Sequence, residues 1–180
     1  MSVTQDPSLA LLHQAEELGH ESRARLDDHA SLKLWLRLLA CTTQLETEVR
    51  RRLRQRFGIS LARFDYMSQL YRHPKGLRMK ELSRSLMVTG GNVTGLTDEL
   101  EREGFVVRED SPTDRRAWIV RLTDKGRAGF EAMAEEHERW IREMFAGLDA
   151  ATVRGLHTQL GTLRTHLASV LTPAEGDSTA

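Results

Sequence analysis

The stretch FVVREDSPTDRRAWIVRLTDKG, residues 105–126, decides the fold. Its segments 105–108 and 117–122 are rich in β-branched and aromatic residues, which favour strands. Between them, residues 109–116 are polar and include a proline, as turn segments do. The stretch therefore predicts a two-stranded hairpin with a charged tip. Thr123, directly after the second strand, is a residue type that favours the start of a helix.

The rest of the chain has the pattern of amphipathic helices, with apolar residues recurring at three- and four-residue spacing. Gly58 and Gly104 each follow such a pattern and favour a helix end, whereas Ser60 and Thr89 can cap a helix start. The helices expected from these signals cover residues 8–26, 31–57, 60–72, 79–86, 90–103, 123–145 and 149–171.

Three helices, a short turn, a further helix and a hairpin follow one another in the order of a winged helix-turn-helix. The second helix of such a pair enters the major groove of DNA, and here it is the segment 90–103. Its first turn contains Gly90 and Gly91, although a glycine inside a helix costs about 1 kcal/mol relative to alanine. Glycine lets the backbone approach a phosphate closely, and free N–H groups at a helix start favour phosphate oxygens. Asn92 and Thr94 are polar residues that can reach base edges.

The predicted hairpin tip adds a second set of candidate DNA contacts. Arg115 and Arg116 lie in a turn segment that cannot be core, and arginine is attracted by the negative potential of a minor groove. Asp114 would be unfavourable near phosphates unless it holds an arginine in place through a charge-assisted hydrogen bond. The alternative is a solvated turn beside a poor helix start. Both features occurring together, at helix-and-hairpin spacing, favour DNA binding.

The formal net charge of the 180-residue chain is zero, from 26 basic and 26 acidic side chains, which by itself argues against nucleic acid. The charges are unevenly distributed, however. Residues 31–80 carry twelve basic and three acidic side chains, a net +9, whereas residues 1–30 and 131–180 each carry a net −4. Such asymmetry points to an anionic partner, with a solvated helix face as the alternative. We therefore expect only one face of the protein to bind DNA.

Residues 108–116, followed by Leu-Thr-Asp-Lys-Gly at 122–126, resemble the hairpin signature of MarR-type transcriptional regulators. That signature is an Asp-x-Arg, then a hydrophobic strand that ends in Leu-Thr, then a nearby glycine. Glu-Leu-Ser at 81–83 and Gly-Phe-Val at 104–106 also fit the family, and the resemblance covers residues 30–170. It implies a mainly α fold with a small β hairpin, and an obligate homodimer that acts as a ligand-released repressor on a pseudo-palindromic operator.

The resemblance also implies an organisation of the chain and a set of DNA contacts. Residues 1–30 would form an N-terminal extension helix, and 31–57 with 123–171 the helical dimerisation region. Residues 58–122 would form the winged helix-turn-helix lobe, here called the winged lobe, and 172–180 a tail. The expected DNA-binding residues are Thr89, Gly90, Gly91, Asn92, Thr94, Asp114, Arg115 and Arg116.

A narrower resemblance concerns the effector. Residues 35–39, 63–65 and 87–95 are similar to the branch of the family that controls aromatic-compound catabolism. This implies an aromatic-acid effector, such as a hydroxycinnamate or benzoate, or its coenzyme A thioester. In the family the effector cavity lies between the dimer helices and the winged lobe. The effector-binding residues expected from this are Trp35, Arg63, Phe64, Met67 and Tyr71, with core packing as the alternative for the apolar ones.

Patterns for catalysis, cofactors and metals are missing from the sequence. The seven histidines show no metal-ligand spacing, and no nucleophile–base order or dinucleotide motif stands in a suitable context. We therefore expect neither an enzyme nor a metal or cofactor site. The longest apolar run is far below the roughly 20 residues that span a bilayer, and the N-terminus lacks a signal-peptide pattern, so a cytoplasmic protein is expected.

Two alternatives remain open. The first is an oxidant-responsive repressor of the same fold that uses Cys41. A sensor thiol needs an electropositive, partly exposed setting, and the position of Cys41 on the apolar side of its helix instead favours a buried structural cysteine. The second is a small-molecule-binding dimer without DNA function, which the absence of sequence-preferring DNA binding would support.

Overall fold

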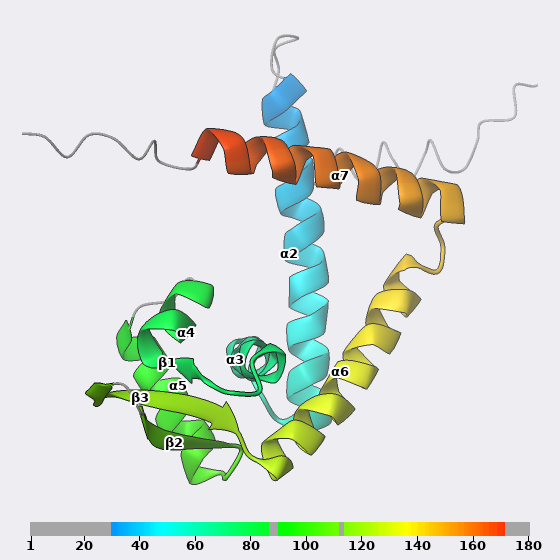
Figure 1. Ribbon diagram of the computed structural model, residues 1–180. Coiled ribbons are helices and arrows are strands. Elements are labelled where there is room, and N and C mark those ends of the chain that lie inside the picture. The colour runs from blue at the N-terminus through cyan, green and yellow to red at the C-terminus, as the bar shows by residue number, and fades with distance from the viewer. Residues whose placement is uncertain (1–29, 87–89, 112–113, 172–180) are drawn as a thin grey trace, which may run out of the picture. The chain divides into compact units, whose positions relative to one another are not determined.

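The computed structural model describes three stretches of the chain: residues 30–86, 90–111 and 114–171. The chain divides into two compact units, residues 1–137 and 138–180. Within the described stretches the structure is helical apart from one small sheet (Figure 1). The helix predicted over 8–26 and the tail 172–180 lie outside the described residues. No described helix is long and apolar enough to cross a membrane.

The first two described helices match the prediction closely. Helix α2 (Ala30–Phe57) ends just before Gly58. Helix α3 (Leu61–Arg72) begins after Ser60, whose hydroxyl accepts a hydrogen bond from the backbone N–H of Arg63. Helix starts and stops of this kind depend on local chemistry, which is why they can be predicted from sequence.

The helix-turn-helix consists of α4 (Met79–Ser85) and α5 (Gly90–Arg102), and both helices are confirmed. The residues that these two helices bury in the winged lobe are Leu82, Val93, Leu96, Thr97 and Leu100. Thr89, the predicted cap of α5, lies outside the described residues.

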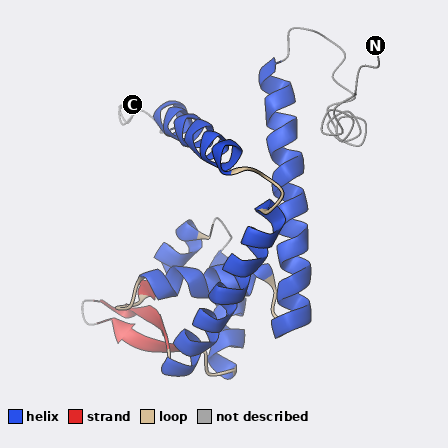
Figure 2. Cartoon of the chain, turned by 90° about the vertical axis from the view of Figure 1, so that its right-hand side faces the viewer, coloured by secondary structure: helices blue, strands red, loops and turns tan. Residues whose placement is uncertain are grey.

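The sheet has three antiparallel strands in the order β1-β3-β2, and it lies at one edge of the winged lobe (Figure 2). Its strands are β1 (Leu77–Arg78), β2 (Val106–Ser111) and β3 (Asp114–Leu122). The sequence did not predict β1, because two residues are too short for a periodic pattern. Gly76 lets β1 approach β3, since a Cβ at Gly76 would lie 2.5 Å from Cγ2 of Ile119 and 2.7 Å from the carbonyl oxygen of Val120.

The hairpin is longer than predicted, so the expectation of a turn over 109–116 is wrong. Its polar residues continue the pairing almost to the tip, with Asp110 opposite Trp118 and Ser111 opposite Asp114 across an irregularity in register. Exposed strands tolerate polar residues when cross-strand pairs support them. Here the guanidinium of Arg121 donates from Nε to the Glu109 carboxylate at 2.7 Å.

Helix α6 (Asp124–Phe145) begins directly after β3, and Thr123 caps it as predicted. The Thr123 hydroxyl accepts a hydrogen bond from the N–H of Gly126 at 3.0 Å and donates to the carbonyl of Gly104 at 2.7 Å. Gly126 itself faces the backbone of Phe105, so closely that a Cβ would lie 1.9 Å from the Phe105 carbonyl oxygen. The base of the hairpin is thus fixed against the first turn of α6.

Helix α3 occupies the centre of the first unit, where it contacts α2, α4, α5 and β3. Phe64, Met67 and Leu70 are buried, whereas Tyr71 is only half-buried. Tyr66 is fully buried but was not predicted, because it lies off the apolar stripe of the helix. A helix buried on more than one side does not show a single stripe.

The first half of α2 is exposed, and this overturns one prediction. Only Val49 and Leu53 of α2 are buried, while Trp35 is 57% exposed. Cys41, predicted to be buried, is exposed and free. The apolar side of α2 on which Cys41 lies is therefore a surface of the single chain rather than part of its core.

Helix α7 (Ala150–Leu171) belongs to the second unit and matches the predicted helix. None of its residues is buried. The large apolar side chains exposed on α7 and the preceding turn are Leu148, Val153, Leu156, Leu160, Leu167, Val170 and Leu171.

Candidate nucleic-acid interface

Helix α5 presents one apolar and one polar side. Val93 is only 1% exposed and Leu100 is fully buried, so these residues fix which side faces the core. The predicted contact residues Asn92 and Thr94 are exposed on the first half of the helix, and Gly90 is its first residue. The first half of α5 is therefore accessible at Asn92 and Thr94. The first backbone N–H groups of a helix have no partner within it and favour phosphate oxygens.

A buried hydrogen-bond network fixes α5 to α3. The hydroxyl groups of Tyr66 and Thr97 lie 2.6 Å apart, and Thr97 also donates to the carbonyl of Val93 at 2.7 Å. Burial raises the pKa of Tyr66 to about 12, which favours the neutral hydroxyl that this network contains. A second link joins the residue directly after α5 to α3, where the Arg63 guanidinium pairs with Glu103.

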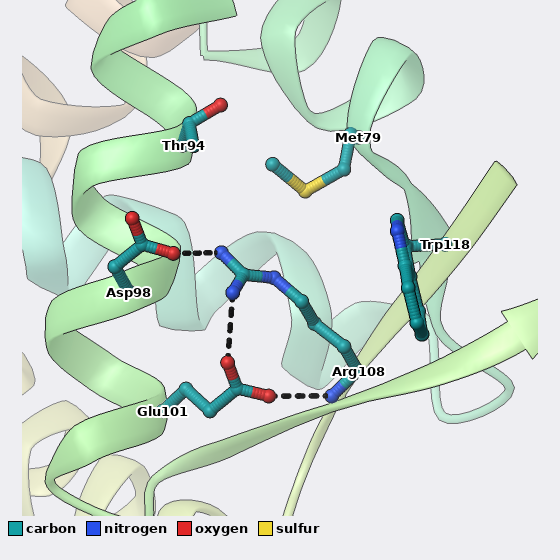
Figure 3. A pocket seen from close by; sticks show the side chains of 6 residues that line it. All are labelled: Met79, Thr94, Asp98, Glu101, Arg108 and Trp118. Carbon is teal, nitrogen blue, oxygen red and sulfur yellow. Dashed lines mark hydrogen bonds and ion pairs between the residues drawn. The ribbon is translucent and has the colours of Figure 1, made fainter.

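Arg108 on β2 links the hairpin to the exposed side of α5 (Figure 3). Its Nη1 donates to the Glu101 carboxylate at 2.8 Å, its Nη2 pairs with Asp98, and its backbone N–H donates to Glu101 at 3.2 Å. Charge-assisted bonds of this kind are stronger than neutral ones. The acids of α5 are thereby partly neutralised, and α5 and the hairpin are held together.

An open groove of about 650 Å³ lies between α5 and the hairpin. The side chains that line it are Met79, Thr94, Asp98, Glu101, Arg108 and Trp118. Trp118 stands on β3 with half of its surface exposed, and Thr94 and Asp98 face it across the groove from α5 (Figure 3). Apart from Thr94, none of these residues was singled out in the sequence as a site residue.

The three predicted hairpin contacts lie on a strand rather than in a turn. Asp114, Arg115 and Arg116 are the first residues of β3, and Asp114 pairs with Ser111 of β2. This places the three residues at the tip end of the hairpin, next in sequence to the turn.

The structure separates the five predicted effector residues. Phe64 and Met67 are buried, and Phe64 stacks near Phe130 with a centroid distance of 5.4 Å. Trp35 lies 22 residues before the end of α2, about 33 Å along the helix axis, and four residues of extended chain span at most about 14 Å. Because α3 starts four residues after α2 ends and Phe64 lies three residues into α3, the Cα atoms of Trp35 and Phe64 are at least about 14 Å apart within one chain.

The half-buried members of this set have partners of their own. The Tyr71 hydroxyl donates to Glu131 at 3.0 Å, which raises the pKa of Tyr71, and the Arg127 guanidinium lies 5.3 Å from the Tyr71 ring centroid. Arg63 pairs with Glu103, but its buried Nε has no hydrogen-bond partner. Burial lowers the pKa of nearby His137, whose ring lies 5.1 Å from that of Phe64.

The described part of the chain contains no cluster of side chains that could bind a metal ion. Within residues 30–86, 90–111 and 114–171, no three His, Cys, Asp or Glu side chains come together as metal ligands would.

The helix-turn-helix, the accessible start of α5 and the adjoining hairpin define a winged helix-turn-helix DNA-binding protein. The MarR family profile matches residues 57–117, from the end of α2 into the hairpin. The HTH-type transcriptional regulator YdgJ of Bacillus subtilis (strain 168) is 33% identical over 113 residues, which cover 63% of this chain and 68% of that protein. The chain belongs to the MarR family and is a DNA-binding transcriptional regulator, not an enzyme.

Solved structures agree with this assignment. A MarR family transcriptional regulator from Silicibacter pomeroyi is 33% identical, with a TM-score of 0.64, over 79% of this chain and 99% of that one. Sco3205, a MarR family regulator from Streptomyces coelicolor solved in complex with DNA, is 27% identical, with a TM-score of 0.70, over 84% of this chain and 93% of that one. The predicted family and fold are therefore confirmed.

Proposed function

We propose that this regulator is a homodimeric repressor that binds a pseudo-palindromic operator and is released by a small ligand. The observation that carries the DNA-binding part is the exposed start of α5 beside the hairpin. In this proposal Thr89, Gly90 and Gly91 approach phosphates, and Asn92 and Thr94 reach base edges in the major groove. Asp114, Arg115 and Arg116 serve the adjacent minor groove or backbone.

The dimer is supported by the exposed apolar side chains. Apart from Trp118, the exposed large hydrophobic side chains of the described residues all lie within 32–39 or 148–171. Exposed apolar patches of this kind mark interaction surfaces. Helix α7 buries none of its residues in the single chain, although most helical stability in proteins comes from tertiary packing. A second copy of the chain would supply that packing and would also cover the start of α2.

We expect Leu160→Ala to weaken dimerisation by about tenfold, because it removes apolar area from the middle of α7. Sedimentation velocity over a dilution series measures the dissociation constant. Thr158→Ala, an exposed polar position of the same helix, is the control and should leave the constant unchanged. A wild-type protein that sediments as a monomer at all concentrations would contradict the dimer.

A twofold dimer implies a defined operator geometry. Its two recognition helices would meet half-sites about one helical turn, roughly 10 bp, apart. Within each protomer α5 is fixed to α3 through Tyr66 and Thr97, and to the hairpin through Arg108. Each winged lobe would therefore move as one body, and a ligand would act by changing the spacing of the two lobes rather than by bending α5.

For the effector we propose an aromatic acid or its coenzyme A thioester, and for the target an aromatic-compound catabolic operon. The support is the similarity of residues 35–39, 63–65 and 87–95 to that branch of the family. Trp35, Arg63, Phe64, Met67 and Tyr71 remain the proposed effector residues. Since Trp35 and Phe64 are separated in this way within one chain, we propose that a shared site takes Trp35 from the second copy. A ligand can release DNA only if it binds the DNA-free state more tightly.

A gel shift on the DNA upstream of the protein's own gene, with aromatic acids and their coenzyme A thioesters added in turn, tests this proposal. Release by one of these classes, and by no aliphatic acid of similar charge, is the expected result. Release by none of them would contradict the proposed effector. No retarded band without ligand would contradict the proposed operator.

A further inference from the structure

We infer that the groove between α5 and the hairpin seats a sugar–phosphate backbone of the bound DNA, with Trp118 as the residue that contacts it. This rests on the proposed placement of α5 in the major groove and of the hairpin in the adjacent minor groove. Neighbouring major and minor grooves are separated by one sugar–phosphate strand. A protein whose helix lies in the major groove and whose hairpin lies in the minor groove must contact that strand with the surface between helix and hairpin. In this protein that surface is the groove lined by Trp118.

The exposure of Trp118 is unusual for its position. Its side chain is 51% exposed. Among the described residues of the winged lobe, it is the one large hydrophobic side chain that is exposed. The other exposed ones lie in the segments proposed for the dimer, which leaves Trp118 without an explanation. Tryptophan combines a flat apolar ring with an N–H that can only donate. The ring can pack against a deoxyribose, and the N–H can donate a hydrogen bond to a phosphate oxygen.

The charges along the groove are consistent with this occupant. Three of the lining residues, Thr94, Met79 and Trp118, carry no charge, and Thr94 lies closer than Asp98 to the start of α5. Asp98 and Glu101 lie further along α5 and would repel a phosphate. Both acids pair with Arg108, so their repulsion is reduced. The backbone would therefore pass over Thr94 and Trp118.

The test compares Trp118→Ala with Trp118→Phe and wild type in fluorescence-anisotropy titrations on the operator and on unrelated duplex DNA. Trp118→Ala should weaken both complexes by about tenfold, because a backbone contact carries no base information. Trp118→Phe keeps an aromatic ring but lacks the N–H, so its affinity for DNA should lie between those of Trp118→Ala and wild type. The slope of log K against log[salt] should stay at the wild-type value, because no charge is removed.

A double variant, Glu109→Gln with Arg121→Gln, is the matched control. It removes the exposed ion pair of the same hairpin without changing the net charge, and it should bind like wild type. Acrylamide quenching gives a readout that a structural role would not move. The fluorescence that Trp118 contributes to the wild-type protein is the part that is lost in Trp118→Phe. This part should be shielded from acrylamide when DNA is bound.

The outcomes separate this inference from the proposed function. Wild-type protein that binds no DNA would overturn the proposed function. Wild-type binding with unchanged affinity in Trp118→Ala, or equal quenching of Trp118 with and without DNA, would overturn the role of Trp118 alone. Weakening on the operator but not on unrelated DNA would show a base contact instead and would also overturn the inference.

Discussion

Replacing Gly126 by alanine is expected to destabilise the fold by about 3 kcal/mol or more. The added Cβ would lie 1.9 Å from the carbonyl oxygen of Phe105 and 2.8 Å from its carbonyl carbon. Both are backbone atoms, so no side-chain rotation can relieve the contact. Relief would require α6 to move away from the base of the hairpin, which would also break the bond from the Thr123 hydroxyl to the carbonyl of Gly104. Differential scanning calorimetry should show a midpoint at least about 6 °C lower.

Gly95→Ala is the control for this prediction. Gly95 also lies in a helix, but no atom lies within 4 Å of a Cβ built there. Alanine is favoured over glycine in a helix by about 1 kcal/mol, so this variant should be slightly more stable than wild type. Equal midpoints for Gly126→Ala and wild type would mean that the hairpin base and α6 are not packed as described.

Replacing Arg116 by alanine is expected to weaken operator binding by about 2 kcal/mol, or about thirtyfold, while the dimer stays folded. Arg116 lies near the tip end of β3, where the proposed function brings it to a minor groove or to the backbone. Arginine is attracted there by the negative potential. A gel-shift titration measures the affinity, and circular dichroism confirms the fold.

Arg142→Ala provides the matched control for charge. Arg142 is 70% exposed on α6, in a weak pair with Glu138 at 3.9 Å. Its loss removes the same positive charge from a residue that is not among the proposed DNA contacts. It should reduce the affinity by less than about twofold. If Arg116→Ala and Arg142→Ala bind the operator equally well, Arg116 does not belong to the interface.

The fold could be predicted largely because its boundaries depend on local chemistry. Ser60 and Thr123 accept the backbone N–H bonds that start α3 and α6. The hairpin was found from its strand-forming ends, but its length was underestimated, since cross-strand pairs such as Glu109 with Arg121 stabilise polar residues in strands. Strand β1 was missed because only its pairing with β3 defines it.

The candidate site was less predictable, because it is built from contacts between distant residues. Nothing in the local sequence shows that Tyr66 meets Thr97, which lies 31 residues further along the chain. Likewise Arg108 and Trp118 become candidates only when β2 and β3 are placed beside α5. The pattern around Cys41 correctly predicts a helix with an apolar side. That side of α2 is a surface of the single chain, so the prediction that Cys41 is buried is wrong.

Net charge also has a structural explanation. The basic segment 31–80 is partly neutralised within α2 itself, where Glu48 accepts bonds from Arg51 and Arg52 and these hold the pKa of Glu48 at about 2. Two of the three acids of α5, Asp98 and Glu101, pair with Arg108. A neutral chain can therefore bind DNA through one face, provided that the acids on this face are paired.

Hydroxyl-radical footprinting on the DNA upstream of the protein's own gene tests the central claim most directly. If α5 and the hairpin of two protomers bind one operator, protected sugars should appear in two related sets, about one helical turn apart and on one face of the duplex. The protection should weaken together with the affinity in Arg116→Ala. Protection spread evenly along the duplex, or none at protein concentrations that saturate the gel shift, would contradict sequence-specific binding through this interface.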